Sequence, residues 1–193
     1  LMLARNTLIV NLRFMDNALS RLPLVPRQGP YSCDGSRIWY DPEHVLRSVK
    51  SEKQRPARDY LHMVMHCIFR HPFVSGRMNR ECWNLATDIA VEIMICDMDI
   101  RQVRTKEVPA MEEEIAKIRQ RVSSPTAEHI YNYLRTSEVS SRDLERWRKL
   151  FTRDDHDIWW EIAEEVIESV LLEVAAPVTL EKRHFVESRL AYD

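Results

Sequence analysis

The chain has 193 residues, of which 28 are Lys or Arg and 30 are Asp or Glu, so its formal net charge is −2. This balance gives no general electrostatic reason to expect a nucleic-acid partner. Only three of the 193 residues are glycine, whereas glycine usually makes up ~7% of a protein. Three glycines are too few for the tight turns of a β-sandwich or for a phosphate-binding glycine-rich loop. With 45% hydrophobic and 30% charged residues, the composition favours a mainly α, folded chain.

No apolar run approaches the ~18–20 residues that a membrane span needs, and the first residues lack the order of a signal peptide. We therefore expect no membrane partner and a cytoplasmic location. The four cysteines form no CxxC pair and are expected to be reduced thiols, namely Cys33, Cys67, Cys82 and Cys96.

Periodicity and breaking residues predict one β-hairpin among seven or eight helices, which is a mainly α (α+β) fold. A first helix is expected over residues 1–22, followed by a hairpin that turns at Cys33–Ser36 and continues as Arg37–Tyr40. Later helices are expected over 41–49, 56–70, 79–99, 110–122, 125–136 and 141–152, and from Asp154 or Asp155 to about 174, followed by a last, looser helical segment over 180–190. We divide the chain into a core, 1–105, and a helical extension, 106–193, which could also form one continuous domain.

Two histidines, His62 and His66, stand four residues apart in the helix predicted over 56–70. This spacing places both rings on one face, one turn apart, so both can turn a nitrogen toward one metal ion, and zinc accepts imidazole readily. A bare HxxxH pair is also frequent by chance. The alternative is therefore two histidines that simply pack against other polar groups.

A carboxylate on the next helix strengthens the metal hypothesis. Asp88 follows His66 by twenty-two residues, and Glu92 lies one turn later on the same face of a helix that is apolar almost all round. We expect Asp88 to be the third ligand and Glu92 to orient an imidazole from behind. His71 is the alternative third ligand, if the helix breaks before it, and the following Pro72 permits such a break.

These residues, in this order, resemble a bacterial family of zincin-like metallopeptidase domains that is usually joined to a von Willebrand factor A-like domain. The resemblance covers roughly residues 4–95 and rests on a leading helix, the hairpin segment 33–42, the histidines of 62–71 and the stretch 83–88. It implies a zincin-like core, in which an active-site helix lies beneath a small sheet and a second helix completes a zinc site. The stretch 154–159, DDHDIW, also resembles a segment of this family, although acidic residues simply favour a helix start as well.

One departure from the family pattern concerns Met63. Zincins have a glutamate directly after the first histidine, and that carboxylate is the general base that takes a proton from the attacking water. A thioether cannot do this, so we expect a domain that is catalytically impaired or inactive, a pseudoenzyme that still binds zinc. An active enzyme would need another carboxylate, such as Glu81 or Asp34, in this role.

A non-enzymatic reading is the alternative. The fold would then present its helices to a protein partner. By resemblance, that partner would be a von Willebrand A-like domain or an AAA-type ATPase. This expectation of a partner rests on analogy with the family alone, because no residue of the chain indicates a partner directly.

Overall fold

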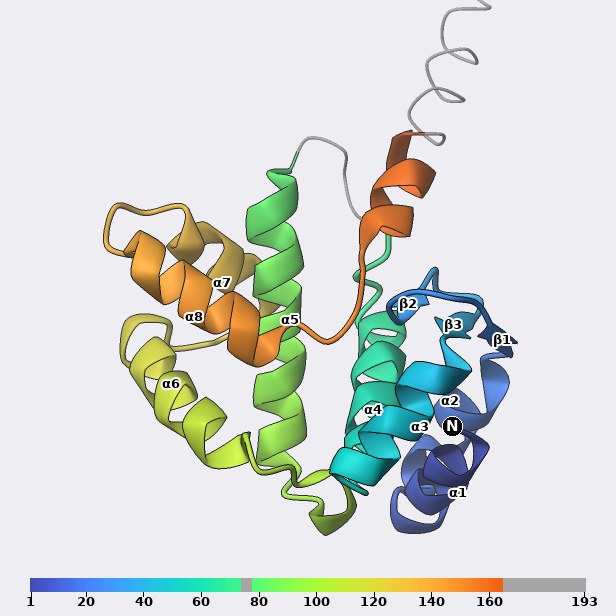
Figure 1. Cartoon of the computed structure of the whole chain (residues 1–193). Coiled ribbons are helices and arrows are strands. Elements are labelled where there is room, and N and C mark those ends of the chain that lie inside the picture. The colour runs from blue at the N-terminus through green and yellow to red at the C-terminus, as the bar shows by residue number, and fades with distance from the viewer. Residues whose placement is uncertain (74–77, 165–193) are drawn as a thin grey trace, which may run out of the picture.

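A computed structural model describes residues 1–73 and 78–164 of the chain (Figure 1). Helices dominate it, and they accompany one small sheet, as the sequence predicts. The helices are α1 (Met2–Asn11), α2 (Asp16–Arg21), α3 (Pro42–Ser51), α4 (Arg55–Ile68), α5 (Arg80–Asp97), α6 (Val108–Arg121), α7 (Ala127–Leu134) and α8 (Ser141–Phe151), with short 3-10 helices η1 (Arg13–Met15) and η2 (Arg101–Val103). Residues 157–164 are also helical.

The sheet has three strands in the order β1–β3–β2, made of β1 (Leu24–Pro26), β2 (Ser32–Cys33) and β3 (Ile38–Tyr40). The predicted hairpin is present, because β2 and β3 pair antiparallel. Asp34 shapes its turn by accepting the backbone N–H groups of Ser36 and Arg37 at 2.7 and 2.9 Å. The parallel strand β1 was not predicted, since a three-residue strand that ends in a proline carries almost no periodic signal.

The first predicted helix is divided in the structure. It breaks at Leu12, whose backbone leaves the helical region, and resumes through η1 into α2. A straight helix of 22 residues would be about 33 Å long, whereas α4, against which both parts pack, has 14 residues and is about 21 Å long. The break lets Leu8 and Leu19 both lie fully buried in the core.

Capping residues set the starts of the other helices much as expected. Asp41 accepts from the N–H of Glu43 at the start of α3, Asn79 accepts from Cys82 at the start of α5, and Ser140 accepts from Asp143 at the start of α8. At the last helix the side chain of Asp155 accepts from the N–H of Asp157, which leaves Asp154 free for another role. The predicted continuation to 174 and the helix over 180–190 lie outside the described residues.

Helices α4 and α5 lie side by side at the centre of the molecule. The sheet and α1–α3 cover one side of this pair, and α6–α8 pack against α5 on the other (Figure 1). One hydrophobic cluster extends from Leu8 to Trp160, across the expected division at 105/106. That division stays a prediction. Within residues 1–73 and 78–164, no helix has the length and apolarity that crossing a bilayer requires.

Candidate metal centre

Helix α4 presents the two predicted histidines to the interior. The Nε2 atoms of His62 and His66 lie 2.8 Å apart, and neither side chain is exposed. Helix α5 brings Asp88 alongside, with its Oδ1 atom 3.3 Å from each of these nitrogens. The structure therefore brings together the three residues that the spacing singled out as metal ligands.

A fourth donor comes from a part of the chain that the site prediction left out. The Oδ1 atom of Asp154, which follows α8, lies 3.4 Å from Nε2 of His62 and 3.9 Å from Nε2 of His66. The available signal was the acidic–acidic–histidine run at 154–156, which we interpreted mainly as a helix start. A local sequence pattern cannot reveal that this turn lies against a helix some ninety residues earlier.

The geometry of these four donors fits a tetrahedral ion. Four ligands held at about 2.0–2.1 Å from zinc lie about 3.3–3.4 Å from one another. The five distances above range from 2.8 to 3.9 Å, and all four donor atoms lie within 4.8 Å of one another. The second carboxylate oxygens of Asp88 and Asp154 are also buried, and the described part of the chain gives them no hydrogen-bond partner. Two imidazoles and two carboxylates are a suitable donor set for zinc.

Glu92 contacts His62 from the side away from the cluster. Its Oε1 atom lies 2.8 Å from Nδ1 of His62, and its other oxygen accepts from the buried Arg58, whose Nε is 2.9 Å away. Arg58 also donates to the carbonyl oxygen of Val103 at 3.0 Å. A carboxylate at Nδ1 keeps the proton on that nitrogen and leaves Nε2 available as a ligand.

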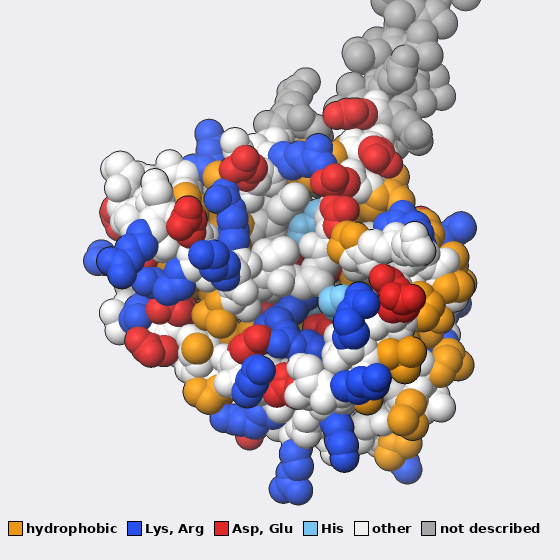
Figure 2. Space-filling view, viewed as in Figure 1, with side chains coloured by type: hydrophobic (Ala, Val, Ile, Leu, Met, Phe, Trp, Pro, Cys, Tyr) orange, Lys and Arg blue, Asp and Glu red, His pale blue; other side chains and the backbone are white. Residues whose placement is uncertain are grey.

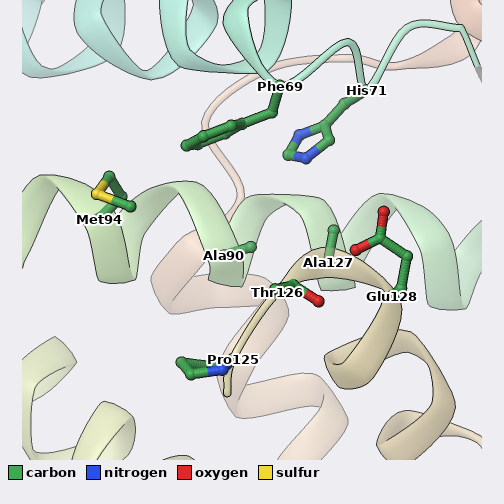
Figure 3. A pocket seen from close by; sticks show the side chains of 8 residues that line it. All are labelled: Phe69, His71, Ala90, Met94, Pro125, Thr126, Ala127 and Glu128. Carbon is green, nitrogen blue, oxygen red and sulfur yellow. The ribbon is translucent and has the colours of Figure 1, made fainter.

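His71 does not lie with the four donors. Its Nδ1 atom is 3.0 Å from Nδ1 of His66, the ring nitrogen that faces away from Asp88 and Asp154. It therefore stands behind His66 as Glu92 stands behind His62. His71 also lines a cavity of about 260 Å³, in which it lies beside Phe69 and faces Ala90 and Met94 of α5 (Figure 3).

His156 closes the cluster from the same segment as Asp154. Its Nε2 atom lies 3.2 Å from Oδ1 of Asp88 and 3.1 Å from Oδ1 of Asp154, and its ring stacks on Trp159 with centroids 3.9 Å apart. Burial alone would lower the pKa of His156, but the two carboxylates raise it to about 10. The cluster thus holds a positive charge beside its carboxylates.

The charges inside the cluster favour exchange of protons for a cation. Burial lowers the pKa of His66 to about 4, so this imidazole is neutral. Burial opposes the protonation of His62, but hydrogen bonds with Asp154, Asp88 and Glu92 raise its pKa well above the usual value. Protons on His62 and His156 therefore balance the two aspartates, and a divalent cation could provide the same compensation.

The position after His62 holds no catalytic carboxylate. Met63 is fully buried and belongs to the hydrophobic core. Asp34 is engaged in the hairpin turn, and Glu81, whose side chain is 78% exposed, pairs with Arg148 on α8. Cys67, beside His66, packs against the core.

A polar cavity of about 350 Å³ leads to the cluster from outside. Asp88, Asp154 and His156 form its inner wall, and Glu81 and Arg148 are among its other lining residues. On the face drawn in Figure 2, the surface is hollowed between α8 and the segment that follows it. Basic side chains gather on the α8 side of this hollow, and acidic ones on the other.

Comparison with known proteins agrees with the class that the site defines. Residues 2–156 match the family described as "Putative metallopeptidase domain", and the chain belongs to this family. The matched range includes every residue of the cluster described above, through His156. No curated protein and no solved structure matches the chain.

Proposed function

We propose that this protein is a zinc-binding, metallopeptidase-like domain without ordinary peptidase activity. The observation that carries the proposal is the buried cluster of His62, His66, Asp88 and Asp154, whose spacing suits one tetrahedral ion. His62, His66 and Asp88 would hold the zinc. Glu92 and His71 would orient the imidazole rings of His62 and His66, respectively, by contacting their Nδ1 atoms. Zinc in such a site supplies a Lewis acid and, where its coordination contributes to folding, stability.

The absence of a base at Met63 supports the inactive reading. A general base contributes about 10²–10⁴ to the rate of proton transfer in the transition state. Asp34 is engaged in the hairpin turn, and Glu81, which lines the cavity beside the cluster, pairs with Arg148. This weakens the alternative of an active metallohydrolase with a relocated base.

Elemental analysis of the purified protein, before and after dialysis against a chelator, tests metal binding. We expect about one zinc per chain, lost or strongly reduced in His62→Ala and His66→Ala. His129→Ala is the matched control, because His129 is an exposed histidine on α7. A wild-type protein that binds no more zinc than either variant would overturn the metal-site proposal.

Hydrolysis assays on casein and generic peptides test the loss of activity. We expect no zinc-dependent hydrolysis by the wild-type protein. Hydrolysis that a chelator abolishes, that zinc restores and that His62→Ala eliminates would show an active peptidase instead.

A role as a protein-interaction module is the second candidate. Several large apolar side chains of the N-terminal helices and of α3 are exposed, among them Leu3 and Phe14 at 80% and Leu46 at 62%. The resemblance to the family favours a von Willebrand A-like domain or an AAA-type ATPase as the partner. It also favours a bacterial cytoplasm as the location, where the four unpaired cysteines would stay reduced. Co-purification of such a partner with the wild-type protein, and its loss in Leu3→Glu with Leu46→Glu, would support this role.

A further inference from the structure

The segment after α8 is attached to the core at two places. We call residues 153–159 the closing segment. At the first place, the Arg153 guanidinium lies 3.0 Å from Oε2 of Glu107 and 3.5 Å from Oε1 of Glu92. Arg153 is 8% exposed, so this end of the segment is fixed within the protein.

The closing segment also covers the outer edge of the sheet. β2 ends the strand order, and its other side pairs with β3. Backbone groups two residues apart on a strand point to the same side. The carbonyl oxygens of Tyr31 and Cys33 both accept from the closing segment, from the N–H of Asp155 at 2.7 Å and from Nε1 of Trp159 at 2.6 Å.

Asp154 is held between these two anchors, next to the metal-binding histidines. Its side chain is fully buried, and its Oδ1 atom is about as far from Nε2 of His62 as Asp88 is, 3.4 against 3.3 Å. Its Oδ2 atom finds no hydrogen-bond donor among the described residues. Its Oδ1 atom accepts a hydrogen bond from His156 at 3.1 Å, but a buried carboxylate whose other oxygen has no partner, this close to two imidazoles, is also arranged to bind a metal ion.

We propose that Asp154 is the fourth ligand of the metal, so that the closing segment occupies the position that a catalytic zinc site keeps open. Catalytic sites use three protein ligands and leave the fourth position to water or substrate, whereas structural sites use four. The protein therefore carries a closed metal centre, with its own chain lying at both the ion and the sheet edge. This inference rests on the proposed zinc site and assigns its coordination.

Cobalt substitution tests the number of protein ligands without any activity assay. Zinc is spectroscopically silent, whereas Co²⁺ in the same site absorbs in the visible and responds to each ligand that binds it. Azide is the probe, because it binds to a metal only where a coordination position is open. We expect azide to leave the spectrum of the wild-type cobalt protein unchanged, and to shift that of Asp154→Ala.

The same variant should also bind zinc more weakly. Loss of a partner that only orients a ligand costs about 10–100-fold in affinity, so loss of Asp154 itself should cost at least about 100-fold. Asp157→Asn is the matched control, since Asp157 lies in the same segment but pairs with Arg80 at the surface. We expect the control to keep both the affinity and the insensitivity to azide.

The outcomes separate this inference from the proposed function. A wild-type cobalt protein whose spectrum shifts with azide would overturn the role of Asp154 and leave the zinc site intact. A wild-type protein that binds neither zinc nor cobalt would overturn both. If Asp154→Ala fails to fold, as its circular dichroism would show, Asp154→Asn replaces it, and the wild-type response to azide still decides the question.

Discussion

Asp59 is a buried carboxylate that no described residue satisfies at its Oδ1 atom. Burial raises its pKa to about 7, although Arg55 and His62 act in the opposite direction. A raised pKa means that the folded state holds this proton more tightly than the unfolded state does. Its contribution is therefore present at low pH and is lost as the pH rises through about 7.

Because of this group, a rise from pH 5 to pH 8 should lower the free energy of unfolding by about 2–3 kcal/mol. We expect Asp59→Asn to lack that decline and to be the more stable protein at pH 8. Urea denaturation at several pH values measures it, with Asp99→Asn as control because Asp99 is 81% exposed on its side chain. Parallel pH profiles of wild type and Asp59→Asn would contradict the prediction.

Met63 allows a sharper test of why the domain is inactive. A glutamate there replaces a fully buried core residue, so Met63→Glu should lower the free energy of unfolding by about 2–4 kcal/mol. We expect no peptidase activity from this variant alone, because Asp154 still fills the metal's fourth position. Met63→Glu combined with Asp154→Ala should show zinc-dependent hydrolysis above wild type. Equal activity in the single and double variants would mean that Asp154 does not close the site.

At the scale of elements, Glu114 joins α6 to α8. Its Oε2 atom accepts from Nε1 of Trp147 at 2.8 Å and from Arg146 at 2.9 Å, and Lys117 donates to Oε1 at 2.8 Å. Burial opposes ionisation, but these three donors lower the pKa of Glu114 below its usual value. The stabilisation is thus present at neutral pH and is lost as the pH falls through the lowered pKa.

We expect Glu114→Gln to lower the free energy of unfolding by about 1–3 kcal/mol at pH 7. The difference from wild type should shrink as the pH falls through the lowered pKa of Glu114, because the wild-type carboxylate is then protonated as well. Chemical denaturation measures both values. Glu113→Gln is the control, because Glu113 is 71% exposed and contacts only Lys117 of these partners; an equal loss in both variants would show that the link to α8 contributes nothing.

The elements show where sequence reasoning succeeds and where it ends. The caps Asp41, Asn79 and Ser140 and the i,i+4 pair on α4 depend on neighbours in the sequence, so their positions could be predicted. Asp154 depends on a contact between segments some ninety residues apart, and its acidic neighbours offered the simpler interpretation of a helix cap. The break at Leu12 likewise follows from the length of α4, which the first helix alone does not reveal.

At the scale of the whole molecule, the cluster unites three separate parts of the chain. α4 supplies His62 and His66, α5 supplies Asp88, and the closing segment supplies Asp154. An ion held by all three would bind the folded state alone, so it should stabilise the entire fold.

Zinc at about 100 times its dissociation constant adds about 2.7 kcal/mol to the free energy of unfolding. For a chain of this size, that corresponds to a rise in Tm of about 5–10 °C. We expect differential scanning calorimetry to show this rise on addition of zinc and its reversal by a chelator, with no response in His66→Ala. An identical Tm with zinc and with chelator would show that zinc at the cluster does not stabilise the fold.

Zinc K-edge X-ray absorption of the zinc-loaded protein tests the four-residue centre most directly, because it counts the ligands and measures their distances. We predict four nitrogen and oxygen ligands at about 2.0–2.1 Å, two of them imidazoles, and no sulfur near 2.3 Å. Six oxygen ligands, as for an ion held loosely at the surface, or a sulfur ligand from Cys67 would contradict a centre built from His62, His66, Asp88 and Asp154.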